Sequence, residues 1–299
     1  MSEYHTPVLL DESVSALVQN TSGVYADATF GGGGHSREIL SRLTENGRLF
    51  AFDRDEDALA NSIQDKRFTL IHNNFRFIHN YALKEGVLFD GILADLGVSS
   101  HQFDTAQRGF SFRYDAPLDM RMNKEAQKSA ATVVNSFERE ELEKIFKLYG
   151  EVENAHKVAS LIVSARAGKE IETTFELNEA IAPSLPSFAE HKYLAKVYQA
   201  LRIEVNDEMR ALEKFLDGAA KSLKQGGRLV VITYHSLEDR MVKNFIKAGN
   251  IEGEVCKDIY GNSFSPLNAV NRKPILPQEE EISLNTRARS AKLRIAERI

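Results

Sequence analysis

The sequence has one cysteine, Cys256, among its 299 residues, and this scarcity excludes an intramolecular disulfide and a zinc site built from several cysteines. A single thiol also fits a reducing compartment. The eight histidines include no pair at the helical i,i+4 spacing through which two side chains bind one metal ion. We therefore expect no metal site.

Long hydrophobic runs are missing as well. No segment approaches the roughly 18 apolar residues needed to cross a bilayer, and the first ten residues lack the charged and apolar regions of a signal peptide. The sequence therefore predicts a cytoplasmic protein that does not use a membrane. With 42% hydrophobic and 27% charged residues, it has the composition of a folded globular protein, which excludes a disordered chain.

The charge is unevenly distributed. A net charge of −5 argues against nonspecific coating of nucleic acid. Residues 1–100 carry 14 acidic and 8 basic side chains, a balance of −6, so the remainder sums to +1. The segment from Arg287 to Arg298 holds five basic residues and one acidic residue, a balance of +4 that can meet phosphates. A solvated basic edge strand is the alternative.

Short apolar runs alternate with helical patterns in the first hundred residues. Four runs are rich in aliphatic or aromatic residues and bounded by Gly, Asn or Asp, as is typical of strands: Val24–Phe30, Arg48–Asp53, Phe68–His72 and Phe89–Leu96. Between the first two, His35–Leu43 places its apolar residues on one helical face. Strands separated by helices imply a parallel sheet, so this part predicts a doubly wound α/β domain.

The alternation stops near residue 104, and helical spacing then continues to residue 202 without a strong strand. A long helix is predicted over Leu201–Leu223, ended by Gly226-Gly227, and residues 252–278 read as irregular. The sheet is expected to resume at Arg228–Tyr234 and to end with Ala291–Glu297. The predicted organisation is a sheet domain of residues 1–103 and 203–299, interrupted by a helical domain of residues 104–202.

Four consecutive glycines, Gly31 to Gly34, join the first predicted strand to the following helix. Glycines at a helix N-terminus let a ligand lie against backbone amides, although they also form plain flexible turns. Asp53 follows 20 residues after Gly33, where a carboxylate accepts hydrogen bonds from the hydroxyls of an adenosine ribose. Because the glycines depart from the G-x-G-x-x-G spacing of dinucleotide sites, S-adenosylmethionine is the favoured ligand. A branched side chain at Gly33 is expected to occupy the space in which this ligand lies.

Asp95 closes the fourth predicted strand. The carboxyl ends of strands in an open sheet face one crevice, so Asp27, Asp53 and Asp95 are expected to converge there, although a lone aspartate at a strand end is more often a cap. An exocyclic amine is a poor nucleophile, because its lone pair is delocalised into the ring. A carboxylate such as Asp95, or a backbone carbonyl in the next loop, can accept its hydrogens and stabilise the charge that develops as it attacks a sulfonium methyl.

Several unusual sequence words occur in order along the chain: HTPVLLDE (residues 5–12), DLGVSS (95–100), RGFSF (108–112), PLDMRM (117–122), YHSLEDR (234–240) and RARSAKLR (287–294). They resemble the words of the MraW (RsmH) family of S-adenosylmethionine-dependent methyltransferases, which modify N4 of a cytidine in the decoding (P-site) region of bacterial 16S rRNA. The resemblance spans nearly the whole chain. It implies a class I methyltransferase sheet with an inserted helical domain.

The resemblance also implies roles for individual residues. Asp95 and His235 are the catalytic candidates, and His235 is expected to face the substrate, with capping of the next helix together with Ser236 as its alternative role. Phe75 is expected to lie against the face of the adenine as an apolar wall. The residues assigned to S-adenosylmethionine are Gly33, Gly34, His35, Asp53, Phe75, Asp95 and Gln102.

The implied substrate is 16S rRNA, within the small ribosomal subunit. Arg108, Asp119 and Arg121 lie in blocks rich in aromatic residues, which suits an unstacked base held against a ring, although such a composition also packs a domain junction. Arg287 and Arg289 are the candidates for phosphate contacts.

Three positions depart from the family pattern. Lys196 stands where the family commonly has arginine, which puts a bidentate contact there in doubt. Thr286 replaces a proline and Tyr234 replaces a phenylalanine. None of the three is expected to touch the cofactor motifs.

Other functions stay open from the sequence. A methyltransferase acting on DNA or on a protein amide is one alternative, and a non-catalytic adenosine-ligand sensor that binds the ribosome is another. A nicotinamide dehydrogenase is disfavoured by the glycine spacing. The sequence leaves the choice between monomer and homodimer undecided.

Overall fold

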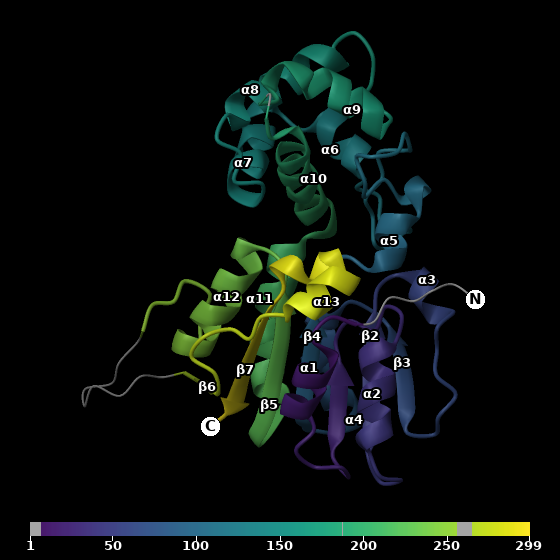
Figure 1. The fold of residues 1–299 in the computed structure, drawn as a ribbon, viewed down its shortest axis with the longest axis vertical. Helices are drawn as coiled ribbons and strands as arrows, with labels where there is room; N and C mark the ends of the chain where they lie inside the picture. Colours follow the sequence, from purple (N-terminus) through teal and green to yellow (C-terminus); the bar gives the residue numbers. More distant parts are fainter. Residues whose placement is uncertain (1–6, 187, 256–264) are drawn as a thin grey trace. The chain divides into compact units, whose positions relative to one another are not determined.

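The computed structural model describes residues 7–186, 188–255 and 265–299, and divides the chain into two compact units. The first unit comprises residues 1–97 and 209–299, and the second comprises residues 98–208 (Figure 1). The sequence places the two junctions at 103/104 and 202/203. His5 and Thr6 of the first sequence word lie outside the described residues, as does Cys256.

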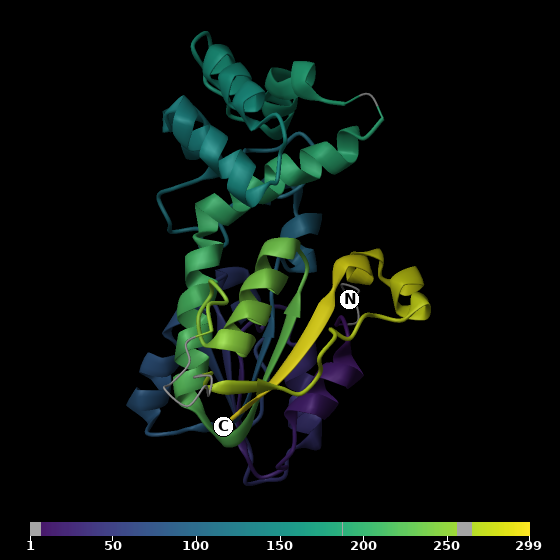
Figure 2. The same ribbon diagram turned by 90° about the vertical axis from the view of Figure 1, so that its left-hand side faces the viewer.

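The first unit is built on a seven-stranded sheet with the order β3-β2-β1-β4-β5-β7-β6. Neighbouring strands from β3 to β5 are parallel, whereas β7 runs antiparallel to β5 and β6, as Figures 1 and 2 show. This is a doubly wound α/β sheet, as the sequence predicts. The strands are β1 (Val24–Asp27), β2 (Arg48–Asp53), β3 (Phe68–His72), β4 (Phe89–Asp95), β5 (Leu223–Thr233), β6 (Leu267–Ala269) and β7 (Lys292–Arg298).

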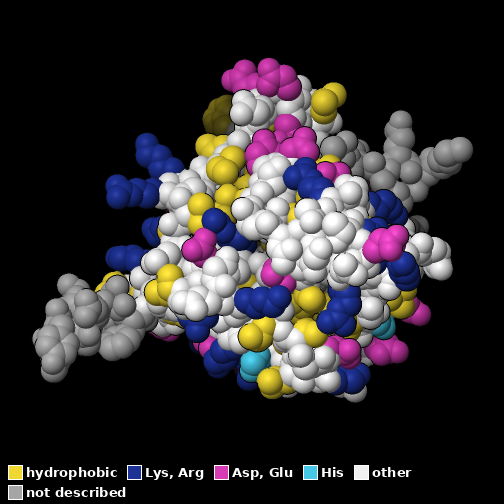
Figure 3. All heavy atoms as spheres, turned by 90° about the horizontal axis from the view of Figure 1, so that it is seen from below, with side chains coloured by type: hydrophobic (Ala, Val, Ile, Leu, Met, Phe, Trp, Pro, Cys, Tyr) yellow, Lys and Arg dark blue, Asp and Glu magenta, His cyan; other side chains and the backbone are white. Residues whose placement is uncertain are grey.

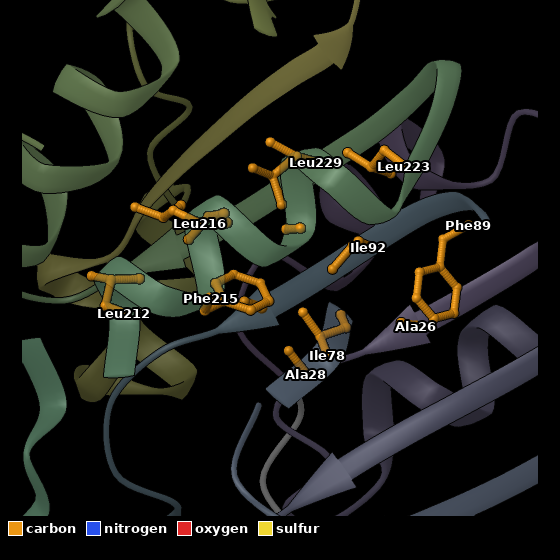
Figure 4. Close-up of a cluster of buried hydrophobic side chains, with 14 of the residues drawn as sticks. Ala26, Ala28, Ile78, Phe89, Ile92, Leu212, Phe215, Leu216, Leu223 and Leu229 are labelled. Atoms are coloured by element: carbon orange, nitrogen blue, oxygen red, sulfur yellow. The ribbon is translucent and has the colours of Figure 1, made fainter. Parts of the chain in front are cut away.

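Helices cover both faces of the sheet. Successive side chains along a strand point to opposite faces, and both sets are buried. On β5, Leu229 and Val231 join the core under α4, α11 and α12, whereas Val230 and Ile232 join the core under α1 and α2. Figure 4 shows the first of these cores, with Phe215 of α11 packed among aliphatic side chains. The helices of this unit are α1 (Leu10–Leu17), α2 (Gly34–Arg42), α3 (Glu56–Leu59), α4 (Ile78–Glu85), α11 (Glu208–Ser222), α12 (Ser236–Ala248) and α13 (Glu279–Leu284).

The second unit is helical and has its own apolar core, in which Phe146 and Leu201 are fully buried. Its helices are α5 (Ser100–Asp104), α6 (Ala130–Ser136), α7 (Arg139–Tyr149), α8 (Ala155–Arg166), α9 (Thr174–Ile181) and α10 (Glu190–Asn206). Side-chain caps mark the N-termini of several of these helices. At α9, the Thr173 side chain accepts a hydrogen bond from the amide of Glu176, and the Glu176 side chain accepts one from the amide of Thr173.

Several elements differ from the sequence-based expectation. β5 begins at Leu223, five residues before its predicted start, so Gly226-Gly227 lie within the strand and do not end the helix. β1 ends at Asp27, three residues before its predicted end. The single helix expected from residue 201 to 223 is broken at Asp207, whose φ of 51° ends α10 before α11 begins. β6 forms within the stretch expected to be irregular, because its three residues pair with the edge of β7. By contrast, β2 and β3 have the predicted bounds, and the last strand is confirmed within one residue at each end.

Within the described ranges, no helix is long and apolar enough to cross a membrane. Figure 3 shows side chains of both charges interspersed over the face seen from below.

Candidate active site

Three aspartates end neighbouring parallel strands: Asp27 on β1, Asp53 on β2 and Asp95 on β4. In the register, Asp27 pairs with Ala51 and with Leu93, so Asp53 and Asp95 each lie two residues beyond the partner of Asp27. Asp27 is therefore set back between the other two. This confirms the predicted convergence at the carboxyl edge of the sheet, the edge at which open α/β sheets bind ligands.

Asp27 is fully buried and is hydrogen-bonded to the start of α2. Its Oδ2 accepts a hydrogen bond of 2.6 Å from the Ser36 hydroxyl on α2, and its Oδ1 accepts one from the amide of Thr29. Burial raises the pKa of this carboxyl, while the nearby His35 opposes the rise. Asp27 thus ties β1 to α2 and has no exposed surface with which to meet a ligand.

Asp53 holds the loop that contains the glycines. Its Oδ2 accepts a 2.7 Å hydrogen bond from the amide of Gly31, and its Oδ1 accepts a 2.8 Å bond from the amide of Asp55. Burial raises the pKa of Asp53 to about 6. A carboxylate has roughly four lone-pair positions, so after these two bonds Asp53 can still accept hydroxyl hydrogens from a ribose.

Asp95 is held by three elements. Its amide donates to Thr29 Oγ1 at 2.7 Å, its Oδ1 accepts a 2.7 Å hydrogen bond from the Tyr234 hydroxyl, and its Oδ2 lies 3.7 Å from His35 Nδ1. The side chain is 23% exposed. Burial raises the pKa of Asp95 to about 6, and the charge of His35 and the Tyr234 hydrogen bond oppose the rise. The carboxylate is thus ionised at neutral pH and open on one side.

His35 connects this carboxylate to the start of the chain. Its ring is buried, with Nε2 3.2 Å from the carbonyl oxygen of Val8. A Cβ added at Gly34 would lie 2.2 Å from Pro7 Cγ, so Gly34 is glycine because Pro7 packs against it. Pro7 and Val8 of the first sequence word therefore lie against the glycine turn and the start of α2.

Within the turn, Gly33 and Gly31 serve different purposes. Gly33 precedes α2 with φ 76°, and a Cβ there would lie 2.9 Å from the ring of Phe30. The expectation that a side chain at Gly33 fills ligand space stays a prediction, because an added Cβ would also meet this core ring whether or not a ligand lies there. Gly31 has φ 51° and open space on its Cβ side, and α2 has no side-chain cap at its N-terminus. Gly31 is therefore the glycine of this turn beside which a ligand has room.

The other two cofactor candidates have different surroundings. Phe75 begins the 3₁₀ turn after β3 and packs edge-on against Phe215 at a ring distance of 5.2 Å. It is partly buried, which leaves part of its surface for an adenine. Gln102 belongs to the second unit, where it is buried and its side-chain oxygen accepts from the amide of Ser99 to cap α5.

His235 has the helix-capping role that the sequence predicts only as its alternative. It caps α12, with Nδ1 accepting from the amide of Glu238 at 3.4 Å and Nε2 3.1 Å from Glu238 Oε1. Its side chain is only 9% exposed. This geometry explains its place in the YHSLEDR word without a catalytic role, so catalysis by His235 stays a prediction without support from these contacts.

The RNA candidates of the second unit are engaged within it. Arg108 is buried and its guanidinium donates to the carbonyl oxygens of Arg121 and Met122. Arg121 forms a bidentate pair with Asp119, at 2.9 and 2.6 Å. Arg108 thus supports the local backbone, and its RNA contact stays a prediction without support from these contacts. The Asp119–Arg121 pair is partly exposed, and its RNA contact also stays a prediction.

The basic C-terminal segment is only partly available. Arg294 donates to both oxygens of Asp239 on α12, and Lys292 lies 3.5 Å from the same carboxylate. Arg287 and Arg289, in the 3₁₀ turn before β7, are exposed. The sequence-based balance of +4 therefore overstates the charge that this segment presents, because α12 supplies a counter-charge.

The contact of Tyr234 with Asp95 is not predicted from the sequence. Its hydroxyl bonds directly to Asp95, so the expectation that this departure leaves the cofactor motifs untouched is wrong. Position 234 directly follows β5, beside β4 in the sheet, and this placement was the available signal. Lys196, a second departure, donates to the carbonyl oxygen of Glu151 by a single bond of 3.1 Å.

The strand order, the antiparallel β7 and the carboxylates at the ligand-binding edge define a protein of the class I methyltransferase type. The MraW methylase family model matches residues 2–299, and the chain belongs to that family. A protein called ribosomal RNA small subunit methyltransferase H from Bacteroides fragilis (strain YCH46) is 58% identical over 296 residues, covering 99% of this chain and 97% of the relative. A Flavobacterium johnsoniae protein of the same name is 55% identical over 298 residues, covering 99% and 98%.

Among solved structures, the crystal structure of a putative rRNA methylase from Clostridium thermocellum covers 100% of both chains with a TM-score of 0.45 and 15% identity. This likeness is too low to add to the argument.

Replacing Asp95 by asparagine tests the burial of its charge. In the folded chain the pKa of Asp95 is raised to about 6, so the native state binds more protons than the unfolded state between roughly pH 4 and 6. Stability conferred by the protonated form is therefore lost as pH rises through this window. Asp95→Asn should be more stable than the wild type by roughly 1–3 kcal/mol at pH 8, and the gain should shrink towards pH 4.

The measurement is the free energy of unfolding by urea at several pH values. Asp11→Asn is the control, because the Asp11 side chain is 88% exposed. A difference between Asp95→Asn and wild type that does not vary with pH would contradict the assignment.

A methyl group at Gly31 tests whether a ligand lies against the turn. Gly31 and Gly86 both have positive φ and no atom within 4 Å of an added Cβ, so alanine at either should cost a similar roughly 1–2 kcal/mol of stability. Gly86 ends α4, on the opposite edge of the sheet. Only Gly31→Ala should weaken binding of S-adenosylhomocysteine in calorimetry, by roughly tenfold or more. Equal affinities for the two variants would remove Gly31 from the site.

Proposed function

We propose that this protein transfers the methyl group of S-adenosylmethionine to N4 of a cytidine in the decoding region of 16S rRNA. The observation that carries the proposal is the match to the MraW methylase family over residues 2–299. The names of the relatives add the small-subunit rRNA as the substrate. A ribosomal substrate implies the cytoplasm as the place of action.

The residues at the sheet edge fit S-adenosylmethionine. Asp53 has lone pairs for the ribose hydroxyls, Phe75 offers an apolar face for the adenine, and the open side of Gly31 leaves room beside the uncapped start of α2. Gly33, Gly34 and His35 shape this turn, and Gln102 stays a candidate from the family motif. When bound, the cofactor supplies a methyl group on a sulfonium, which is electrophilic.

Asp95 is the residue best placed to assist the acceptor amine. Its partly exposed carboxylate is ionised at neutral pH and can accept an N–H hydrogen bond from the exocyclic amine, which frees density for attack on the methyl carbon. Once the amine carried the methyl group that the cofactor supplies, Asp95 or solvent would take up the proton that its nitrogen loses. Residues that hold the amine and the cofactor in place would supply much of the remaining acceleration through orientation.

The second unit is the proposed recognition domain for RNA, with the Asp119–Arg121 pair as its candidate contact. Arg287 and Arg289 are the candidate phosphate contacts of the first unit. The alternatives, transfer to DNA or to a protein amide, use the same chemistry at Asp95 and are decided by substrate.

The direct test is to incubate the protein and labelled S-adenosylmethionine with 30S subunits, naked 16S rRNA, DNA and total protein. We expect label at N4 of one cytidine in the decoding region and none in the other polymers. Asp95→Asn should retain its fold and lose transfer. Label on another nucleotide, on DNA or on protein would overturn the assignment.

Exchanging Arg287 and Arg289 for glutamine tests the phosphate contacts. RNA affinity should fall with cofactor affinity unchanged, and the slope of log affinity against log salt should decrease by up to about 0.7 for each lost contact with single-stranded RNA. The control is the double exchange of Lys66 and Lys84, two exposed lysines at the opposite edge of the sheet. Parallel salt titrations for wild type and the arginine variant would exclude this segment from RNA binding.

A further inference from the structure

Tyr234 directly follows β5 and is fixed at three points. Its hydroxyl donates to Asp95 Oδ1 at 2.7 Å, and its amide donates to Glu238 Oε2 at 2.9 Å. Its ring lies close to Gly97, where an added Cβ would be 3.2 Å from Tyr234 Cδ2. A donor held in this way has little freedom to turn away from the carboxylate.

We infer that Tyr234 is a positioning residue for Asp95: its hydroxyl fixes the orientation of the carboxylate and favours its charged form. The effect of Tyr234 on catalysis rests on the proposed function of Asp95. Its effect on the orientation and protonation of Asp95 does not depend on that function.

The charges around Asp95 explain why such a donor matters. His35 faces it from α2 with Nδ1 3.7 Å away, whereas the carboxyl groups of Asp27 on β1 and Glu238 on α12 repel a second negative charge. Burial adds to this repulsion. The Tyr234 hydroxyl opposes both effects by donating a hydrogen bond to the ionised form.

The tyrosine itself stays a donor across the working pH range. Burial and the neighbouring negative charges of Asp95, Glu238 and Glu281 raise the pKa of its hydroxyl well above the usual value. With Oδ1 occupied by this bond, Oδ2 accepts no hydrogen bond from the described residues and is the natural acceptor for an incoming N–H. Removal of the hydroxyl leaves Oδ1 without this donor and makes protonation of Asp95 easier.

The test is Tyr234→Phe, which removes the hydroxyl that bonds to Asp95 and retains the ring. Tyr25→Phe is the matched control, because Tyr25 is a buried tyrosine of β1 whose hydroxyl donates to the carbonyl oxygen of Asn20, away from Asp95. Each variant loses one tyrosine hydroxyl that is hydrogen-bonded within the first unit. Only Tyr234→Phe loses a bond to the candidate site.

The first readout is the titration of Asp95 in the ligand-free protein, followed by carboxyl ¹³C NMR. Asp95 should titrate roughly one pH unit higher in Tyr234→Phe than in wild type or Tyr25→Phe. The second readout is the pH profile of methyl transfer to 30S subunits. The acidic limb should move upward by the same interval, so that Tyr234→Phe is roughly tenfold slower on that limb and within about threefold of wild type at pH 8.

An Asp95 titration in Tyr234→Phe that overlays wild type would overturn the inference, as would a shift that Tyr25→Phe shows equally. If the titration moves as expected while wild type fails to methylate 30S subunits, the positioning role is supported and the proposed function fails. The two conclusions are thus separable.

Discussion

The placement of three carboxylates at one edge of a parallel sheet is the constraint on which the candidate site depends. Low-dielectric surroundings disfavour their charge, so each needs donors from elsewhere. The Ser36 hydroxyl of α2 donates a hydrogen bond to Asp27, and the amide of Gly31 donates one to Asp53. The Tyr234 hydroxyl, after β5, donates one to Asp95. The glycine turn, the start of α2 and the junction of β5 with α12 are therefore positioned by the same requirement.

These carboxylates reduce stability rather than increase it. Asp53 and Asp95 both have a pKa of about 6, so at neutral pH the fold carries two ionised groups whose charge burial disfavours. A sequence selected for stability alone would place amides or apolar residues there. Perturbed acids gathered at the ligand-binding edge are the pattern typical of an active site, which agrees with the family assignment.

The sequence predicts the parts of this structure that leave a local signal. β2 and β3 are short apolar runs between polar residues, and Asp53 and Asp95 end their strands as expected. The break at Asp207 was not predictable, because helical spacing continues across it. The Tyr234–Asp95 bond joins residues 139 positions apart, and the pairing of Arg294 with Asp239 joins residues 55 apart. Neither has a local sequence pattern.

The four glycines show why a motif alone does not assign a ligand contact. A side chain at Gly34 would clash with Pro7, and a side chain at Gly33 would clash with Phe30. Gly33 also has a positive φ. Packing within the chain therefore explains two glycines of the motif. Gly31 has no such neighbour, and its amide is bonded to Asp53, the carboxylate assigned to the ribose. Loss of activity on substituting Gly33 or Gly34 would therefore report on the fold, whereas Gly31 separates the space for a ligand from the packing of the turn.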